Sequence, residues 1–471
     1  MVIIVGGGVS GLAAGIRLLR GGEPVTVIEM CPAAGGNLCG WVRDGYTIDN
    51  CIHWLSGTTD GELRKIWEET GLLSGETGIH RPEYLYRSYG AGGHISFYRD
   101  PERTREEARA ALGRAAAPFI KFIDSCERCA EEGGAGFASR VRRMLSAARY
   151  APRDLSSLAA SMKNPLAASA VTDLLTGEYS SLGLYMLYSA FIRGNADIPL
   201  GGSVGAAERI KNKFLSLGGT LRLGETVETV IISNSSARGV RLSSGEEIRG
   251  DGVILALDPR VAFGRLLPGT LMPEKLAGMY TRPTAYPIFS AVQLAFSHPV
   301  DSLPLRGICG VPVRPLAFGG RVLRRLTVRE FSYEKDFAPP GQTVLQCMLF
   351  TRAGESRAWI DLRRDDPGLY RLKKRDISSA VADRLSEYFG TDALGILDVW
   401  TPATYNRYFG SHLGAFMSFA LTGHAIPKKI EPAVPGVRRL FLAGQWTTPP
   451  GGLPSAVYSG YAAADAALRL I

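Results

Sequence analysis

Apolar residues near the start of the chain come in short runs that predict two strands and a helix in a fixed order. Val2 to Val5 is a β-branched run, typical of a strand that is buried on both faces. A glycine-rich turn over residues 6–11 follows, then an apolar pattern of helical period over residues 12–20 and a second buried run over residues 24–28. This order predicts the first unit of a Rossmann-like, doubly wound α/β sheet.

The glycines of the turn have a spacing that suits the phosphates of a dinucleotide. Gly6 permits the turn, Gly8 lets the backbone come close to a pyrophosphate, and Gly11 lets the helix pack tightly on the strand. The phosphates would lie at the helix N-terminus beside Val9 and Ser10, where free N–H groups and the helix dipole favour an anion.

Glu29 stands at the end of the second predicted strand. An acid about 20 residues past the glycines accepts hydrogen bonds from the hydroxyls of the adenosine ribose. Its negative charge would repel a 2′-phosphate, so the pattern disfavours NADP.

Further along the chain the pattern changes twice. Residues 60–190 are mainly helical in pattern, whereas a helix over residues 205–217 and a buried strand over residues 252–257 resemble the opening unit again. Residues 270–425 alternate strand-like and helical stretches. With 471 residues, of which 45% are hydrophobic and 21% charged, we expect two or three globular domains.

Two sets of motifs, one at each end of the chain, resemble the same superfamily. Near the start, Gly35-Gly36-Asn37 is followed by the run from Asp44 to Asp49. Near the end come the runs Leu440 to Trp446, Pro450 to Gly452 and Ser455 to Gly460. These motifs are similar to the extended dinucleotide motif and the closing segment of the flavin amine oxidase and phytoene desaturase superfamily.

The resemblance implies a Rossmann-like FAD-binding domain, an inserted α+β substrate domain and a helical cap. The implied FAD domain is discontinuous, with residues 1–60, 195–265 and 430–471, while residues 61–194 would form the cap and residues 266–429 the substrate domain. FAD would be held without a covalent bond, because the C-terminal flavin segment has no cysteine. Besides the first turn and Glu29, the implied cofactor contacts are Gly36, Asn37, Val227, Gly444, Gln445, Gly452 and Ala456.

Three positions depart from the superfamily pattern. Asn37 stands where many relatives have an arginine near the phosphates, so one positive contact is missing. Asn50-Cys51 replaces a pair that ends in glycine, which makes the backbone beside the flavin less permissive. Gln445 replaces an acid that contacts the ribityl hydroxyls, although a glutamine can still form a hydrogen bond there.

Charge and cysteine usage exclude several classes of protein. The net charge is +9, but the basic residues are scattered and no nucleic-acid-binding motif is present, so we expect no nucleic-acid partner. The first strand leaves no room for a secretory signal, and no uncharged run approaches the ~20 residues of a membrane span. We therefore expect a cytoplasmic protein. Cys126 and Cys129 form a CxxC without a second pair or a nearby histidine, so no metal site is predicted.

The stretch from Phe137 to Arg149 has two interpretations. Apolar residues recur in it at helical spacing, with four arginines around them. Such a helix could lie on an anionic membrane surface, which suits the bilayer-dissolved substrates of phytoene-desaturase-like enzymes. It could equally pack on its own domain and expose a basic face. The sequence leaves peripheral membrane contact open.

His53 is the candidate catalytic residue. The segment from Asp49 to Trp54 follows the extended motif and, by resemblance, approaches the flavin ring. Since histidine titrates near neutrality, His53 could exchange a proton with the substrate or form a hydrogen bond to the ring. The alternative is a structural histidine that only holds the loop.

Two apolar aromatic stretches could line a tunnel for a long hydrocarbon, although ordinary core packing explains the same residues. They are Tyr179, Leu182, Leu184, Tyr185, Met186, Tyr188 and Phe191 in the first stretch, and Phe416, Met417 and Phe419 in the second.

The resemblance implies an FAD-dependent oxidoreductase that desaturates or saturates a carbon–carbon bond of a long apolar isoprenoid, polyene or lipid, as relatives of phytoene desaturase and retinol saturase do. An alternative is redox-neutral cis-trans isomerisation with reduced FAD, in the manner of carotenoid isomerases. The electron donor or acceptor is left open.

Two further classes share the fold. Amine oxidases often place a lysine on a strand beside flavin N5, and the corresponding stretch, Phe289 to Phe296, has Gln293 instead. This argues against amine oxidation. Non-catalytic escort proteins bind lipidated partners, but the intact phosphate turn and Glu29 favour a chain that still holds its cofactor.

Overall fold

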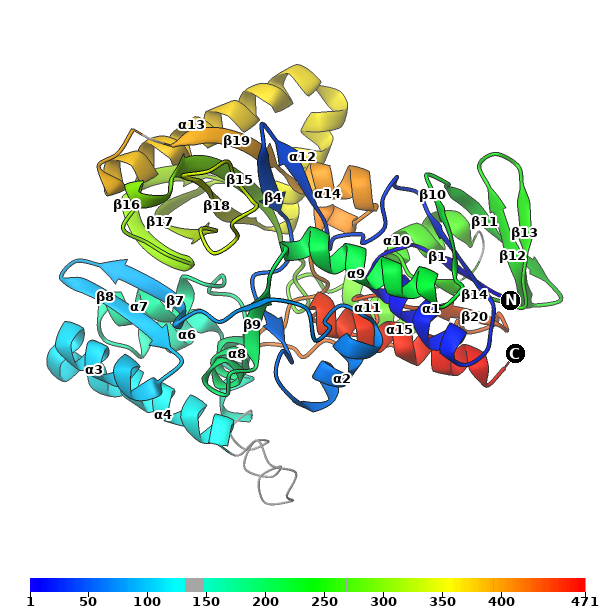
Figure 1. Ribbon diagram of the computed structural model, residues 1–471, viewed down its shortest axis with the longest axis horizontal. Coiled ribbons are helices and arrows are strands. Elements are labelled where there is room, and N and C mark those ends of the chain that lie inside the picture. The colour runs from blue at the N-terminus through cyan, green and yellow to red at the C-terminus, as the bar shows by residue number, and fades with distance from the viewer. Residues whose placement is uncertain (132–147, 268–269, 271, 393, 471) are drawn as a thin grey trace.

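Two large sheets, each covered by helices, make up the computed structural model (Figure 1). The structure describes residues 1–131, 148–267, 270, 272–392 and 394–470.

The first sheet has five parallel strands, and both ends of the chain contribute to it. The strands lie in the order β10, β2, β1, β14, β20. Their bounds are β1 (Val2–Val5), β2 (Val25–Glu29), β10 (Thr220–Leu223), β14 (Gly252–Leu255) and β20 (Leu440–Leu442). This is the strand order of a Rossmann-like sheet, and it confirms the predicted fold class.

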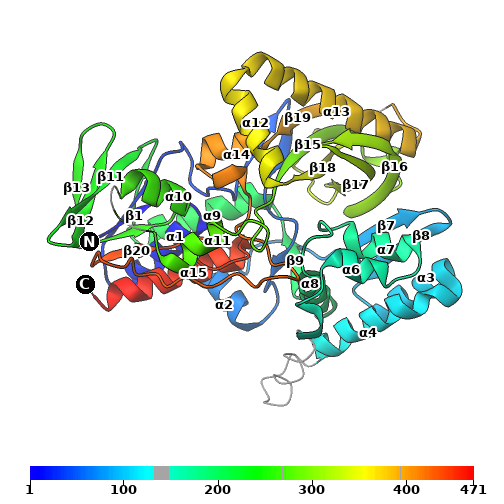
Figure 2. The ribbon, with the colours of Figure 1, turned by 180° about the vertical axis from the view of Figure 1, so that it is seen from behind.

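Helix α1 (Val9–Arg20) packs between α9 (Gly202–Ser216) and α15 (Gly452–Leu468). Their small and aliphatic side chains share one buried cluster with the strands of this sheet and with Trp67 of α2 (Gly61–Glu69). Because α15 returns beside α1, the N- and C-termini lie close together in both views (Figures 1 and 2).

Several shorter strands extend this part of the molecule. A three-stranded antiparallel sheet follows β10, and three short strands and a hairpin connect the first sheet to the rest of the chain. The bounds are β11 (Val227–Ser233), β12 (Ser236–Leu242), β13 (Glu247–Arg249), β3 (Gly40–Arg43), β4 (Tyr46–Asp49), β5 (Leu55–Ser56), β6 (Ile79–His80) and β9 (Ala196–Pro199).

The second large sheet has seven strands in the order β19, β15, β18, β17, β16, β7, β8. Their bounds are β7 (Tyr84–Gly90), β8 (Gly93–Tyr98), β15 (Ser290–Pro299), β16 (Ile308–Phe318), β17 (Arg321–Glu330), β18 (Gln342–Thr351) and β19 (Gly395–Trp400). Among the described residues of this sheet, only the β16–β7 pair is parallel, so the sheet is mixed, as expected for an α+β substrate domain.

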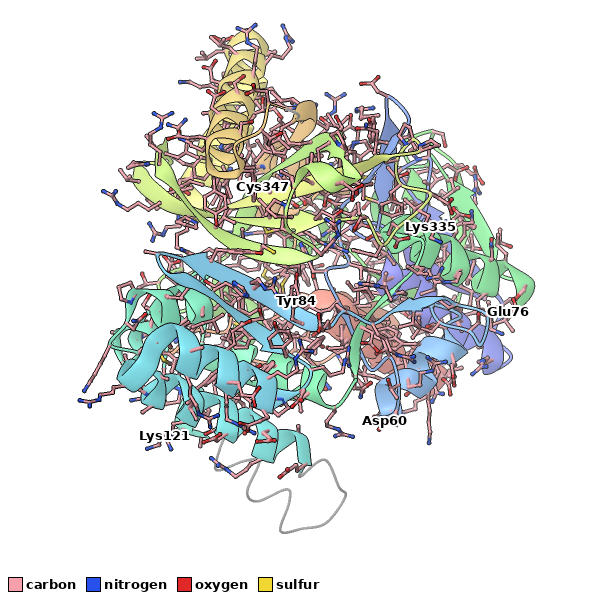
Figure 3. All side chains as sticks on the ribbon, turned by 60° about the vertical axis from the view of Figure 1, so that its left-hand side comes forward. Asp60, Glu76, Tyr84, Lys121, Lys335 and Cys347 are labelled. Atoms are coloured by element: carbon pink, nitrogen blue, oxygen red, sulfur yellow. The ribbon has the colours of Figure 1, made fainter. Side chains whose placement is uncertain are left out.

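Helices cover both faces of this sheet (Figure 1). α13 (Pro367–Phe389) packs Ile377, Val381 and Leu385 against one face. The opposite side carries a helical layer that packs on β7 and β8. This layer comprises α3 (Pro101–Leu112), α4 (Ala117–Glu131), α6 (Leu155–Ala160), α7 (Pro165–Thr172) and α8 (Ser181–Ile192). Figure 3 shows Lys121 on this layer and Cys347 in the sheet above it.

The predicted helical cap over residues 61–194 needs a correction. Residues 84–98 form β7 and β8 and extend the second sheet, while α2 packs into the core of the first sheet. The alternation in β7 is masked by its three tyrosines, and its partner strand β16 lies more than 200 residues further along the chain. The three-domain division with its boundaries remains a prediction.

The predicted amphipathic helix 137–149 falls outside the described residues, apart from its last two positions. Among the helices that are described, none is long and apolar enough to cross a membrane.

Candidate functional site

The glycine turn after β1 brings helix α1 close to the strand. Gly6 has a φ of +107°, and a Cβ there would stand 2.5 Å from the carbonyl oxygen of Ala256. A Cβ on Gly11 would stand 2.0 Å from the carbonyl oxygen of Gly6. Gly8 is the N-cap of α1 and would meet nothing nearer than 3.8 Å. The turn therefore leaves open space at the helix N-terminus, where an anion is favoured.

Glu29 is held at the end of β2 by two backbone donors. Gly7 N–H donates to its Oε2 over 2.7 Å, and Cys31 N–H donates to its Oε1 over 2.8 Å. The carboxylate is buried and lines the same open space. Its remaining lone pairs can accept hydrogen bonds from a ligand there.

A cavity of about 240 Å³ runs over the glycine turn and is lined by residues from three distant parts of the chain. Of the predicted cofactor contacts, all but Gly11 line it: Gly6, Gly8, Val9, Ser10, Glu29, Gly36, Asn37, Val227, Gly444, Gln445, Gly452 and Ala456. Gly11 lies outside the lining, where it serves the contact between helix and strand.

The residues that depart from the superfamily pattern have internal partners. Asn37 Nδ2 donates to the carbonyl of Phe416 over 3.4 Å, while its buried Oδ1 has no hydrogen-bond partner among the described residues. Gln445 Nε2 donates to the same carbonyl over 3.3 Å, and its Oε1 accepts from Gly452 N–H over 3.3 Å. The orphaned Asn37 oxygen at the cavity wall fits a donor supplied by a ligand.

Three charged residues that line this cavity, Glu225, Asp258 and Arg265, are not among the predicted cofactor contacts. Arg265 is the cation among the described residues that line this cavity. Asp258 caps a short turn by accepting from Arg260 N–H over 2.8 Å and from His412 N–H over 2.7 Å. Burial raises the pKa of Asp258 to about 6. Asp258 lies in the pair Asp258-Pro259, which resembles the superfamily but was given no role, whereas no motif indicated Glu225 or Arg265.

The groups that line this cavity fit a dinucleotide. One is the N-terminus of α1, where no side chain caps the free N–H groups. The others are the carboxylate of Glu29, which can accept hydrogen bonds from ribose hydroxyls, and the unpaired oxygen of Asn37. A dinucleotide bound here would span the segments contributed by the two ends of the chain.

A second cavity, of about 550 Å³, lies between the second sheet and helix α8. Five residues line both cavities: Asn37, Cys51, Phe416, Gly452 and Leu453. The two cavities therefore meet at one wall. Most of the second cavity is apolar, and none of the described residues that line it is an acid.

The two aromatic stretches divide between cavity and core. Tyr179, Met186, Phe416 and Met417 line the second cavity. The remaining predicted residues pack in hydrophobic clusters: Leu182, Leu184, Tyr185, Tyr188 and Phe191 in the helical layer, and Phe419 beside Trp446. The helical spacing of apolar residues could not distinguish cavity residues from core residues, because α8 is apolar on every side.

His53 also lines the second cavity, but its expected titration near neutrality is wrong. Burial, together with the positive charge of Arg329, lowers the pKa of His53 to about 3. Its imidazole is therefore neutral at physiological pH, and it can accept or donate a hydrogen bond without carrying charge. Burial of this loop could not be read from its sequence.

A hydrogen-bond network joins Gln293 and Asn50 in the lining of the second cavity to Asn37 in the wall that both cavities share. Asn50 Nδ2 donates to the carbonyl of Asn37 over 3.0 Å, which leaves Asn50 Oδ1 as an acceptor for Tyr405 Oη at 2.7 Å. Trp400 Nε1 donates to the same Oδ1 over 2.9 Å. Gln293 Nε2 then donates to Tyr405 Oη over 2.5 Å. Gln293, on β15, is thus a fixed neutral group of the cavity.

The CxxC cysteines lie elsewhere. Cys126 and Cys129 are on the buried face of α4 as free thiols. No group of metal-ligating side chains is present within the described part of the chain.

Sequence comparison identifies the family. A family model described as flavin containing amine oxidoreductase matches residues 9–468. The chain is 22% identical to the chloroplastic prolycopene isomerase of Daucus carota over 448 residues, which cover 88% of this chain and 71% of that protein. It is 23% identical to the lycopene-forming phytoene desaturase of Pseudescherichia vulneris over an alignment of 503 residues, gaps included, which covers 98% of each chain.

Solved structures share the fold. An oxidoreductase from Methanosarcina mazei aligns with a TM-score of 0.64 at 16% identity and covers 99% of each chain. A double mutant of putrescine oxidase aligns with a TM-score of 0.62 at 17% identity, over 99% of this chain and 98% of that one. Since the family model spans nearly the whole chain, this protein belongs to the flavin-containing amine oxidoreductase family and is an FAD-dependent oxidoreductase.

Proposed function

We propose that this protein desaturates or saturates a carbon–carbon bond of a long apolar isoprenoid, polyene or lipid. The observation that carries the proposal is the apolar cavity of about 550 Å³ that meets the cofactor cavity at a shared wall. Its volume lies within the usual range of small-molecule sites. The similarity to a phytoene desaturase and a prolycopene isomerase supports the same substrate class.

A bound flavin supplies hydride transfer at its N5 atom, so the protein needs few acids or bases of its own. Apolar side chains from both sides of the cavity, such as Met186, Val328 and Met417, would hold the chain and exclude water. We propose that His53 acts at this wall as a neutral hydrogen-bonding group rather than as a charged acid.

We also propose that the FAD is held without a covalent bond by the predicted cofactor residues. Cys51 is the cysteine shared by both cavities. Burial, followed by the nearby charge of Asp49, raises the pKa of the Cys51 thiol far above its usual value. A thiol that stays protonated is a poor nucleophile, so it does not favour attachment to the flavin.

Redox-neutral cis-trans isomerisation with reduced FAD is the second candidate. The same cavity suits it, and the similarity to a prolycopene isomerase over most of the chain favours it. The two reactions differ in whether electrons leave the protein at each turnover, so the electron partner distinguishes them.

Amine oxidation is less well supported. A substrate ammonium group would enter a cavity whose charged lining residue is Arg329 and which has no acid among its described lining residues. Gln293, in the place predicted for a lysine, is engaged with Tyr405.

We also propose that the protein is cytoplasmic and that peripheral membrane contact is the route by which an apolar substrate arrives.

The test follows the visible spectrum of the purified protein under anaerobic conditions. The flavin is first recorded oxidised, then reduced with dithionite, and each form is mixed with a panel of polyenes and of simple amines. Flavin reoxidised by a polyene indicates a saturase, and oxidised flavin bleached by a polyene indicates a desaturase. Geometric change in the polyene with the flavin still reduced indicates an isomerase. Hydrogen peroxide formed from amines, with no response to polyenes, would overturn the proposal.

A further inference from the structure

Arg329 is the one charged side chain among the described residues that line the apolar second cavity. It lies on β17, opposite Ile308 of β16 and Gln346 of β18, and it is only 5% exposed. A cationic side chain is rarely buried without a matching anion, because loss of its water is costly.

Few groups of the protein satisfy this guanidinium. Nη2 donates to Tyr333 Oη over 2.5 Å, and the charge lies 4.2 Å from the centre of the Phe331 ring. The buried Nε has no hydrogen-bond partner among the described residues. Asp49 is 3.9 Å from Nη1, too far for a hydrogen bond.

The Asp49 carboxylate is already engaged elsewhere. Ser203 N–H donates to its Oδ2 over 2.6 Å, and Ser203 Oγ donates to its Oδ1 over 3.0 Å. Cys51 N–H adds a third donor to Oδ1 over 3.2 Å. Asp49 thus balances part of the charge of Arg329 but accepts no hydrogen bond from its guanidinium.

The polar groups beside Arg329 add no negative charge to the cavity. His53 is neutral, and the positive charge of Arg329 helps to hold its pKa low. Gln346 Nε2 donates to the carbonyl of Asp49 over 2.9 Å, which fixes the side chain of Gln346 across the strand from Arg329. This end of the cavity therefore keeps unfilled hydrogen-bond donors, and the nearby acids Asp49 and Glu334 are not among its described lining residues.

A pure hydrocarbon would bury the guanidinium without giving it an acceptor, whereas a carboxylate or carbonyl oxygen would complete it. We propose that Arg329 binds an oxygen carried by an otherwise apolar polyene, so that the substrate is an oxygenated polyene rather than a hydrocarbon. This inference rests on the proposed function, because it takes the second cavity to be the polyene site.

The experiment measures binding of three matched polyenes to the FAD-loaded protein. All-trans-retinoic acid, all-trans-retinal and the corresponding hydrocarbon that ends in a methyl group differ only in the terminal group. Trp54 lines the cavity, so quenching of tryptophan fluorescence reports binding independently of turnover. We expect the acid or the aldehyde to bind on the order of tenfold more tightly than the hydrocarbon, as a hydrogen bond to a charged donor implies.

Three variants assign this preference to Arg329. Arg329→Met should abolish the preference and leave hydrocarbon binding unchanged or tighter, while Arg329→Lys should retain part of the preference for the acid. Arg324→Met, at an exposed position of the same strand, is the matched control and should bind like the wild type. If Arg329→Met does not fold, the wild type and Arg329→Lys still carry the test.

The outcomes separate the two proposals. Preference for the acid alone identifies a carboxylate, and preference for both acid and aldehyde identifies a carbonyl oxygen. Equal binding of all three ligands by the wild type, or an unchanged preference in Arg329→Met, overturns the inference and leaves the proposed function standing. Failure of all three ligands to bind counts against the proposed function itself.

Discussion

At the scale of single residues, Glu29 connects the fold of β2 to the cavity predicted to hold the cofactor. Its two oxygens each accept a backbone N–H, from Gly7 and from Cys31, so the carboxylate cannot turn away from the cavity without losing both bonds. We expect Glu29→Ala to weaken FAD binding about tenfold or more, because acceptors for the ribose hydroxyls are lost. The ratio of flavin to protein absorbance after dialysis measures this.

Glu228→Ala supplies the matched control for Glu29→Ala, since Glu228 is exposed on β11 next to Val227 of the cavity. It should keep its flavin. Full flavin occupancy in Glu29→Ala would contradict the ribose assignment.

His53 should make stability depend on pH. Its pKa falls from an ordinary 6.5 to about 3 in the folded protein. Between these values the unfolded chain binds a proton that the folded chain does not, so the stability contributed by neutral His53 is lost as the pH falls below 6.5. Relative to the wild type, His53→Gln should gain up to about 2 kcal/mol in free energy of unfolding between pH 7 and pH 5.

Urea unfolding at the two pH values tests this prediction. His424→Gln, at an exposed position, is the matched histidine substitution, and its difference from the wild type at the two pH values is the baseline for His53→Gln. A constant difference between His53→Gln and the wild type at both pH values would rule out a lowered pKa for His53.

At the scale of elements, the packing of α15 on α1 depends on a glycine. A Cβ on Gly460 would stand 2.3 Å from the carbonyl oxygen of Ser10 and 3.1 Å from the amide nitrogen of Ala14. We expect Gly460→Ala to push the helices apart and to lower the free energy of unfolding by about 1–3 kcal/mol, despite the better helix propensity of alanine. Thermal unfolding followed by circular dichroism measures it.

Gly354→Ala provides the comparison, because Gly354 lies in α12 (Ala353–Asp365) with open space at its Cβ position. This variant should be neutral or slightly stabilised. Equal melting temperatures for the two alanine variants would mean that α1 and α15 can separate without cost.

Strands and helices with a clear apolar run could be predicted, and contacts between distant segments could not. β1, α1, β2 and β14 follow from short apolar runs that end at glycines or acids. β7 and β8 lie within the predicted helical cap: they pair with each other across a glycine-rich turn, but they join the second sheet only through the pairing of β7 with the remote β16. In the same way, the position of Arg329 in the cavity lining depends on its pairing with Ile308 and Gln346 in the sheet. The sequence pattern along the chain does not reveal this pairing.

At the scale of the whole molecule, the first cavity is where segments from the two ends of the chain meet. Its lining combines the turn after β1, the segment around Val227 and the segment from Tyr408 to Ala456. Direct contacts join the same segments. Arg17 forms an ion pair with Asp465 at 2.8 Å, and the Cys31 thiol donates a hydrogen bond to the Tyr408 carbonyl over 3.0 Å. The motifs at the two ends predicted this meeting, because each is similar to one half of a single FAD site.

Because the cavity joins distant segments, FAD should stabilise the entire fold rather than one loop. A ligand that binds only the folded state at a hundred times its dissociation constant adds about 2.7 kcal/mol. We expect removal of the flavin to lower the melting temperature by several degrees, and added FAD to restore it. Riboflavin lacks the adenosine and phosphate groups that we expect Glu29 and the glycine turn to bind, so it should restore little of the loss. Equal restoration by FAD and riboflavin would show that the flavin ring alone holds the two ends together and that the dinucleotide contacts contribute no stability.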